Sequence, residues 1–232
     1  MKIFAHISWL YTTTIIFISL ALMILLFHFV PKPYSRKIAA WIIRLTTFFS
    51  VEVEGKQDPH AQMFLMNHQS DLDIEIIETV TKDDLAWVAK KELFEVPFFG
   101  LALKLPNDIA VERESKTSLI KLLKDAKQRI DQGRIITMFP EGTRSTKGKM
   151  LPFKSGAKII ANKYKLKVQP IVLMQTAKYF NTKKFYAKPG KIKVIFLDSF
   201  VADENDKDWF KNLRIKMQKV YDDELANNPS HR

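Results

Sequence analysis

The stretch LMNHQSDLD, residues 65–73, joins a short apolar run to a segment with helical patterning. The run AQMFLM (61–66) is typical of a buried strand, and DIEIIETV (73–80) is typical of a helix. Polar residues that end a strand in an α/β sheet often face the ligand crevice. This junction therefore predicts an α/β fold and places His68 and Asp73 where chemistry would occur.

Strand-like and helix-like segments alternate along the rest of the chain. Strand-like runs occupy 85–89, 109–111, 134–139, 166–174 and 191–197, and helix-like patterns occupy 119–130 (with Ser115 as a cap), 155–164 and 208–225. Such alternation favours a parallel sheet with helices over its faces. We predict a mixed, largely parallel α/β sheet covered by helices, in one catalytic domain over residues 51–232.

The N-terminal segment predicts a membrane element. Residues 3–30 contain no Asp, Glu, Lys or Arg. As a helix they would extend roughly 42 Å, against a hydrocarbon core of about 30 Å. A cleaved signal peptide is disfavoured, because its apolar region is usually about 7–15 residues and no small-residue cleavage site follows here. The expected orientation leaves the catalytic domain on the cytoplasmic side of the inner or plasma membrane, because the basic residues follow the segment. These are Lys32, Arg36, Lys37 and Arg44, against Lys2 before it.

A second apolar stretch, IAAWIIRLTTFFS (38–50), is too short to span a bilayer and contains Arg44. It predicts an interfacial helix, or the return arm of a membrane-dipping pair. A core helix is the alternative that its length leaves open. We assign residues 1–50 to an N-terminal membrane-anchoring element of one or two helices.

The composition excludes several classes of site. The 232 residues carry a net charge of +12 and no cysteine, which excludes disulfides, zinc–cysteine sites and a thiol nucleophile. The charge suits an anionic partner: nucleic acid, an anionic membrane or a phosphorylated substrate. There is no G-x-S-x-G or H-E-x-x-H motif, and GTRSTKGKM (142–150) lacks the spacing of a phosphate-binding loop. We therefore expect no bound metal or cofactor.

His68 and Asp73 have the residue types for proton transfer. A carboxylate on one imidazole nitrogen fixes the tautomer and stabilises the imidazolium, so the other nitrogen can take a proton from a substrate hydroxyl. Taken alone, the pair has a competing explanation, in which Asp73 interacts with the helix dipole and His68 is a surface turn residue.

A second polar segment, FPEGTRS (139–145), ends another predicted strand. Gly142 permits a sharp turn that exposes backbone N–H groups. Arg144 can bind phosphate bidentately, and Glu141 can orient that arginine or accept from a hydroxyl. On its own, this segment could also be a turn with a surface ion pair.

Together, the two segments resemble the glycerolipid acyltransferase family, whose best-known members acylate lysophosphatidic acid. Four blocks carry the resemblance in order: NHQSDLD (67–73), KKELFEVPFFG (90–100) with IAVERE (109–114), FPEGTRS (139–145), and VQPIVLM (168–174) with Pro170. The first and third blocks are highly specific as a pair, whereas the fourth is weak. In the second block, Asn107 and Ala110 stand where the family usually has Gly and Phe, and Glu112 stands where it has Asp. Arg113 is kept.

The resemblance implies acyl transfer from a thioester, acyl-coenzyme A or acyl-acyl carrier protein, to the sn-2 hydroxyl of lysophosphatidic acid. It implies His68 as general base with Asp73 as its partner. The acceptor phosphate would be held by Arg113, Glu141, Gly142, Thr143 and Arg144. Lys91 or backbone N–H groups could stabilise the oxyanion or contact the donor.

The resemblance leaves other acceptors open: glycerol 3-phosphate, a lysophospholipid or an amino-acid-derived lysolipid. The expected partners are these lipids, the membrane and the thioester donor, and not nucleic acid. A non-catalytic, membrane-bound anion binder could share the charge, but it would not require His and Asp at this spacing.

Overall fold

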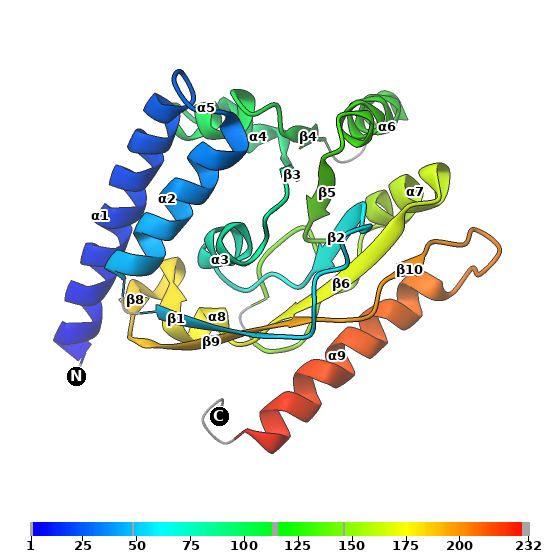
Figure 1. Cartoon of the computed structure of the whole chain (residues 1–232). Coiled ribbons are helices and arrows are strands. Elements are labelled where there is room, and N and C mark those ends of the chain that lie inside the picture. The colour runs from blue at the N-terminus through cyan, green and yellow to red at the C-terminus, as the bar shows by residue number, and fades with distance from the viewer. Residues whose placement is uncertain (1, 48, 113–115, 146, 229–232) are drawn as a thin grey trace.

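The computed structural model describes residues 2–47, 49–112, 116–145 and 147–228 (Figure 1). Its sheet of eight strands has the order β1-β9-β6-β2-β5-β3-β4, with β10 paired to β6. These strands are β1 (Phe49–Glu54), β2 (Met63–Met66), β3 (Leu85–Lys90), β4 (Ile109–Val111), β5 (Ile135–Met138), β6 (Lys167–Leu173), β9 (Gly190–Phe196) and β10 (Phe200–Val201). A separate small ribbon pairs β7 (Phe180–Asn181) with β8 (Tyr186–Ala187).

Five adjacent strands of the large sheet, β6, β2, β5, β3 and β4, are parallel. Strands β1 and β9 are parallel to each other, whereas β9 and β10 are both antiparallel to β6. The predicted mixed, largely parallel sheet is therefore confirmed.

Helices cover both faces of the sheet (Figure 1). Successive residues of β2 point to opposite faces, so Met63 and Leu65 join one core cluster while Phe64 and Met66 join the other. The first cluster packs against α6 (Lys116–Asp131), α7 (Ser155–Tyr164) and α9 (Trp209–Asn227). The second packs against α2 (Lys32–Thr46) and α3 (Leu72–Val80). Shorter helices are α4 (Lys91–Glu95), α5 (Phe99–Lys104), α8 (Thr176–Tyr179) and the 3₁₀ turn Thr182–Lys184.

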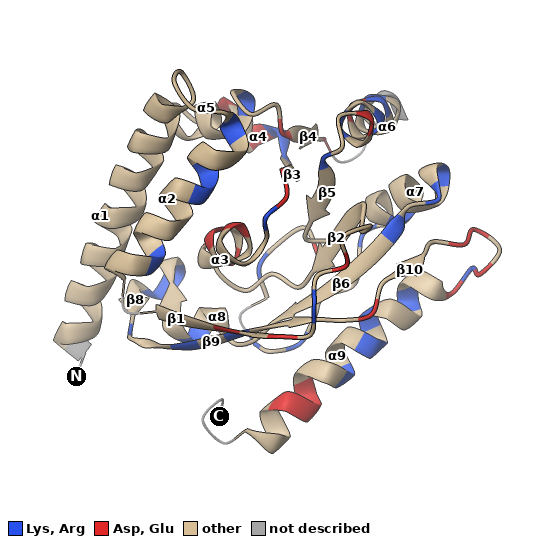
Figure 2. Ribbon diagram, in the orientation of Figure 1, with Lys and Arg blue, Asp and Glu red and all other residues tan. Residues whose placement is uncertain are grey.

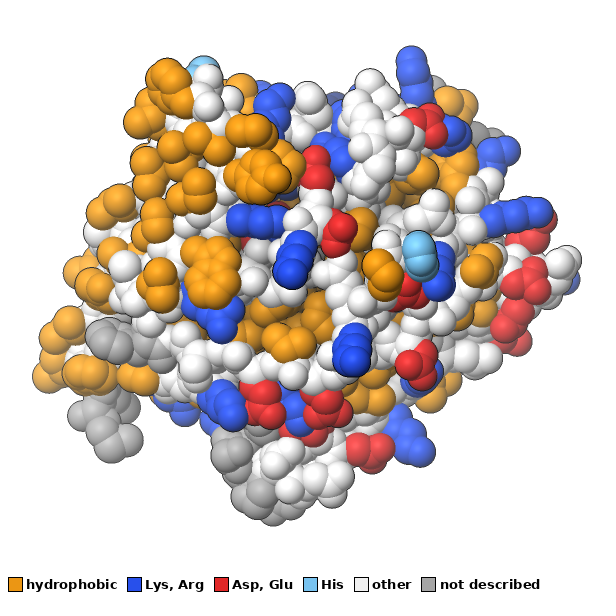
Figure 3. All heavy atoms as spheres, viewed as in Figure 1, with side chains coloured by type: hydrophobic (Ala, Val, Ile, Leu, Met, Phe, Trp, Pro, Cys, Tyr) orange, Lys and Arg blue, Asp and Glu red, His pale blue; other side chains and the backbone are white. Residues whose placement is uncertain are grey.

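The N-terminal helix α1 (Lys2–Leu26) lies beside α2 on the outer side of the second face (Figure 1). Among the described residues, the part Ile3–Leu26 is the one helix long and apolar enough to cross a membrane, with a mean hydropathy of 2.1. After Lys2 the helix contains no Asp, Glu, Lys or Arg, so Figure 2 shows this part of it without charged side chains. Figure 3 shows apolar side chains gathered over this flank. Its outward side chains include Ile3, Phe4, Ile7, Leu10, Phe17, Ile18 and Leu25.

The protein contacts α1 at both ends of the helix. Near the start, His6 Nδ1 lies 2.8 Å from the Phe185 carbonyl oxygen, and the ring of Trp9 packs edge-on against Phe185. Near the end, Met23 packs with Ala39 of α2 and Ala102 of α5. The folded domain therefore runs alongside most of the helix.

The second apolar stretch is not one helix. Helix α2 begins at Lys32, before the predicted start, and ends at Thr46, while Phe49 and Ser50 belong to β1. Its inner face buries Ala40 and Ile43 against the domain, whereas its outer face exposes other apolar side chains. The exposed ones are Tyr34, Ile38, Trp41 and Leu45. The core interpretation therefore holds for the inner face, and the interfacial interpretation of the outer face stays a prediction.

Candidate active site

The site lies at the carboxyl ends of neighbouring parallel strands. Leu65 of β2 pairs with Met138 of β5, so the loop that begins at Asn67 lies next to the loop that begins at Phe139. The carboxyl edge of a parallel sheet is where such folds place ligands. The topology thus brings together the two polar segments that the sequence analysis singled out.

His68 and Asp73 form the predicted pair. Asp73 lies in the first turn of α3, and its Oδ2 is 2.8 Å from His68 Nδ1. The same oxygen accepts from the backbone N–H groups of Gln69, at 2.7 Å, and Ser70, at 2.9 Å. The Asp73 side chain is fully buried, whereas that of His68 is 16% exposed. The pairing at Nδ1 assigns Nε2 as the nitrogen that can exchange a proton with a substrate.

Polar neighbours hold this loop to the sheet. Asn67 donates to the Leu173 carbonyl oxygen at 2.9 Å and accepts from the Leu173 N–H at 2.8 Å, which ties the end of β2 to β6. Ser70 Oγ donates to the carbonyl oxygen of Phe180 at 2.8 Å. Local sequence patterns do not indicate these contacts, because the partners lie more than a hundred residues away along the chain.

Glu141 fastens the two loops to each other. Its carboxylate accepts from the N–H of His68 at 2.9 Å and from the N–H of Leu151 at 2.6 Å. Ser145 N–H donates to the His68 carbonyl oxygen at 2.8 Å. Burial raises the pKa of Glu141, although the two N–H donors oppose that shift. The Glu141 carboxylate thus contacts the backbone of His68 and of Leu151. Its expected contact with an arginine or a substrate hydroxyl stays a prediction.

Two aromatic rings are stacked behind the imidazole, and neither was predicted from the sequence to lie there. The ring of Phe139 is stacked on that of His68, with centroids 3.9 Å apart and planes at 12°. Trp87 of β3 lies behind Phe139, with centroids 5.5 Å apart and planes at 30°. Phe139 belongs to the FPEGTRS segment, so its position in the sequence could have indicated that it lies at the site. Nothing in the sequence around Trp87 indicates that it does.

The expected phosphate-binding residues follow Phe139. Gly142 adopts φ +67°, as the sharp turn requires, but its N–H donates to the Phe139 carbonyl oxygen at 2.9 Å. Thr143 is exposed. Arg144 forms an ion pair with Asp71 and donates to Thr182 Oγ1 at 3.1 Å. These residues lie on the loop beside His68.

The remaining predicted residues are Lys91 and Arg113. Arg113 lies outside the described residues. Lys91 begins α4 at the end of β3, is half exposed, and forms an ion pair with Glu112 at 3.3 Å. Within the described ranges no group of three or more His, Asp or Glu side chains is placed to hold a metal ion.

Comparison with known proteins identifies the family. The family described as Acyltransferase matches residues 38–174, more than half of the chain. The 1-acyl-sn-glycerol-3-phosphate acyltransferase of Helicobacter pylori is 39% identical over 221 residues, which cover 93% of each chain. The protein of that name from Escherichia coli is 26% identical and covers 79% of this chain and 76% of the relative.

The fold comparison agrees with the sequence comparison. A crystal structure of the 1-acyl-sn-glycerophosphate acyltransferase of Thermotoga maritima superposes with a TM-score of 0.80, covering 97% of this chain and 98% of the other. Its sequence is 20% identical, so this likeness shows a shared fold. The resemblance drawn from the four sequence blocks is therefore confirmed, and the chain belongs to the acyltransferase family.

Proposed function

We propose that this protein moves a fatty acyl group from a thioester to the sn-2 hydroxyl of 1-acyl-glycerol 3-phosphate, giving phosphatidic acid for phospholipid synthesis. The observation that carries the proposal is the His68–Asp73 hydrogen bond beside a loop that presents Arg144. The names of the relatives support this acceptor, because those from Helicobacter pylori, Haemophilus influenzae and Escherichia coli are all called 1-acyl-sn-glycerol-3-phosphate acyltransferases.

In the proposed reaction, His68 Nε2 takes the proton of the acceptor hydroxyl as its oxygen attacks the thioester carbonyl carbon. Asp73 holds Nδ1 and stabilises the imidazolium that forms. Collapse of the tetrahedral intermediate breaks the carbon–sulfur bond, and the imidazolium returns the proton to the departing thiolate. No enzyme nucleophile is needed, because the acceptor supplies the alcohol. The oxyanion requires a donor, for which Lys91 and backbone N–H groups are the proposed sources.

The acceptor phosphate is assigned to Arg144 and Arg113, with Gly142 and Thr143 in the same turn. Glu141 supports this site through the backbone, because its carboxylate accepts from the N–H of His68 in the histidine loop and from the N–H of Leu151. Asp71 forms an ion pair with the Arg144 guanidinium. A phosphate dianion would compete with Asp71 for the same N–H groups of Arg144.

Replacing Arg144 with alanine is expected to raise the acceptor KM about tenfold or more with a smaller change in kcat, because a charge-assisted contact is lost. Arg144→Lys should rescue poorly, since the lysine lacks the planar fork. The measurement is steady-state kinetics with lysophosphatidic acid and with a monoacylglycerol that lacks phosphate. Equal damage with both acceptors would contradict a phosphate-binding role.

The donor is proposed to be acyl-coenzyme A or acyl-acyl carrier protein, both of which are acidic and suit a chain of net charge +12. Glycerol 3-phosphate, another lysophospholipid or an amino-acid lysolipid remains the alternative acceptor. A non-catalytic anion binder is disfavoured by the buried carboxylate on the imidazole, which simple anion binding does not require.

We further propose that α1 and α2 dock the protein on one side of a membrane, with the catalytic domain facing the cytoplasm. The support is the apolar outer flank of the two helices together with the domain contacts at both ends of α1. A helix that crossed the bilayer in this pose would carry the polar domain into the hydrocarbon. If the protein docks along the surface, a long-chain acceptor can reach the site without being extracted into water. Extraction would cost a transfer free energy of roughly 0.8 kcal/mol for each CH₂.

Removing residues 1–30 is expected to leave weaker, salt-sensitive binding to anionic vesicles, because α2 and the basic surface remain. Activity should fall more on vesicles than on detergent-dispersed acceptor. A double variant that keeps α1 in place, Ile7→Glu with Leu10→Glu, should also weaken flotation, since both side chains are 61% exposed. The matched control is Ile120→Glu, which alters a 70% exposed residue of α6. Unchanged vesicle binding in the α1 variants would refute this docking.

A further inference from the structure

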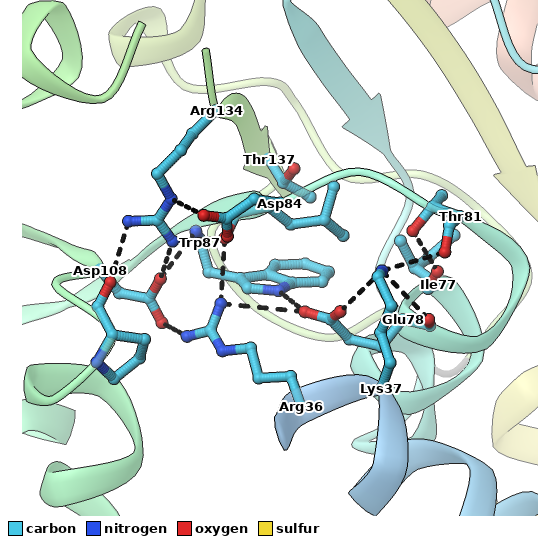
Figure 4. Close-up of polar contacts among 12 residues, drawn as sticks. Arg36, Lys37, Ile77, Glu78, Thr81, Asp84, Trp87, Asp108, Arg134 and Thr137 are labelled. Carbon is cyan, nitrogen blue, oxygen red and sulfur yellow. Dashed lines mark hydrogen bonds and ion pairs between the residues drawn. The ribbon is translucent and has the colours of Figure 1, made fainter. Parts of the chain in front are cut away.

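A buried charge cluster joins α2 to the sheet next to the active site (Figure 4). Arg36 of α2 forms an ion pair with Asp108, which precedes β4, and lies 3.8 Å from Glu78 of α3. Its guanidinium also donates to the Leu85 carbonyl oxygen at 3.0 Å. Both acids are almost inaccessible to solvent, so removing Arg36 would leave buried charges with reduced compensation.

Trp87 connects this cluster to the aromatic rings of the site. Its indole Nε1–H donates to Glu78 Oε1 at 2.8 Å, and its backbone N–H donates to Asp108 Oδ1 at 3.1 Å (Figure 4). The indole is therefore held both through its ring and through its backbone. The other side of the connection is the stack on Phe139, whose ring in turn lies on His68.

We infer that Phe139 and Trp87 position the His68 imidazole for proton transfer, and that Glu78 with Arg36 fixes Trp87 for that task. The inference rests on the proposed role of His68 as the general base. It assigns Phe139 and Trp87 as positioning residues, since neither is required to touch the reacting atoms.

The hydrogen bond to Asp73 alone does not fix the imidazole. One bond at Nδ1 sets the direction of that nitrogen, but the ring can still tilt about the line that joins Nδ1 to the carboxylate. A flat ring stacked at 3.9 Å and 12° removes the tilt, so Nε2 points in one direction. Misplacement of a catalytic group by about 1 Å can lower the rate roughly 10²-fold, which makes this constraint consequential.

The stack also has an electrostatic role. As His68 takes the proton of the hydroxyl, its ring becomes a cation lying on the face of Phe139. The negative face of an aromatic ring attracts a cation within about 6 Å of its centroid. Phe139 thus stabilises the protonated imidazole that forms during the reaction more than the neutral imidazole that precedes it. An interaction that is stronger in the transition state than in the ground state accelerates the reaction.

The residues around Glu78 explain why the indole of Trp87 keeps one position. Lys37 Nζ lies 3.5 Å from Glu78 Oε2, so one basic residue stands at each oxygen of this carboxylate. The carboxylate is thereby held in one orientation, and its hydrogen bond fixes the plane of the indole. Since Arg36 and Lys37 both belong to α2, the helix that lies beside α1 also supports the catalytic base.

The test compares Phe139→Leu with a matched variant, Phe210→Leu, in the full-length protein. Phe210 is a buried phenylalanine in the other core cluster, also in contact with a tryptophan ring. Phe139→Leu is expected to lower kcat roughly 10- to 100-fold with both substrate KM values within about threefold, because orientation rather than binding is lost. Phe139→Tyr, which keeps an aromatic face, should recover most of the loss. Phe210→Leu should leave kcat within about threefold of the unmodified protein. Thermal unfolding of each variant checks that it is folded.

A second pair of variants isolates the tryptophan. Trp87→Phe removes the indole N–H, and its control Trp209→Phe removes a buried indole N–H that donates to Asn162 at 3.0 Å. Trp87→Phe should lower kcat about fivefold, because the ring behind Phe139 loses the hydrogen bond that fixes its plane and the base is less well positioned, and the control should not. NMR of selectively labelled histidine supplies a direct readout: the His68 ring resonances, assigned with His68→Ala, should move in Trp87→Phe and stay in Trp209→Phe.

The outcomes separate this inference from the proposed function. Full activity of His68→Ala would overturn the assignment of the base itself. With His68→Ala inactive, a loss in Phe139→Leu no larger than in Phe210→Leu would overturn the role of the stack. Should Phe139→Leu fail to fold, the decision falls to Trp87→Phe. Unmoved His68 resonances and unchanged kcat in that variant would overturn the support by Trp87.

Discussion

Replacing His68 with alanine is expected to lower kcat at least about 10²-fold, with the acceptor KM nearly unchanged. The physical reason is that a general base acts mainly in the transition state, whereas the acceptor phosphate is bound by other residues. The measurement is the steady-state rate of phosphatidic acid formation by purified protein in detergent micelles.

The control for His68→Ala is His60→Ala. His60 is an exposed histidine of the loop before β2, so its loss should not affect the rate. Thermal unfolding should show that both variants are folded. Near-native turnover of a folded His68→Ala protein would remove the base from the mechanism.

Replacing Asp73 with asparagine is the second substitution expected to have a large effect, again lowering kcat about 10²-fold or more. The amide oxygen can still accept from the N–H groups of Gln69 and Ser70, so the loop should keep its shape. The imidazolium would lose its charged partner, however, and the amide group can hold the ring in the wrong tautomer. The kinetic assay should be accompanied by a melting curve, because the carboxylate is fully buried.

Asp131→Asn is the matched control for Asp73→Asn, because it makes the same chemical change at an exposed ion pair with Lys127. Surface pairs of this kind contribute about 1 kcal/mol or less. If Asp73→Asn retained turnover close to that of Asp131→Asn, Asp73 would be a helix-start residue without a catalytic role. That is the competing explanation which the sequence left open.

Local patterns were sufficient for the central part of the fold. Each predicted strand lies over a strand of the large sheet, and the segment 155–164 is helical over its whole length. These elements were accessible because their hydrophobic period is set within a few residues. The pairing of His68 with Asp73 was accessible for the same reason, since the two residues are only five positions apart.

Non-local contacts account for most of what the sequence did not predict. Strand β1 follows closely after α2, and its first two residues, Phe49 and Ser50, were assigned to the apolar stretch before it. The stack of Trp87 and Phe139 on His68 joins a residue within β3 to residues that follow β5 and β2, and no spacing rule connects them. The contacts of Glu141 with the backbone of His68 and Leu151 likewise depend on how two loops meet.

The charges counted for membrane orientation show the same limit. Arg36 is buried in ion pairs with Asp108 and Glu78, and Lys37 also lies beside Glu78. These two basic residues are therefore compensated inside the fold and contribute less to an attraction between the chain and the membrane surface. Charge counting treats every Lys and Arg as solvated, which folding can change.

The acceptor panel tests the central claim most directly. Purified full-length protein would be given 1-acyl-glycerol 3-phosphate or glycerol 3-phosphate, each with acyl-coenzyme A and with acyl-acyl carrier protein, and with His68→Ala as the blank. We expect phosphatidic acid from 1-acyl-glycerol 3-phosphate with at least one donor, and a rate near the blank with glycerol 3-phosphate. Acylation of glycerol 3-phosphate in preference, or no acyl transfer to the lysolipid with either donor, would contradict the account.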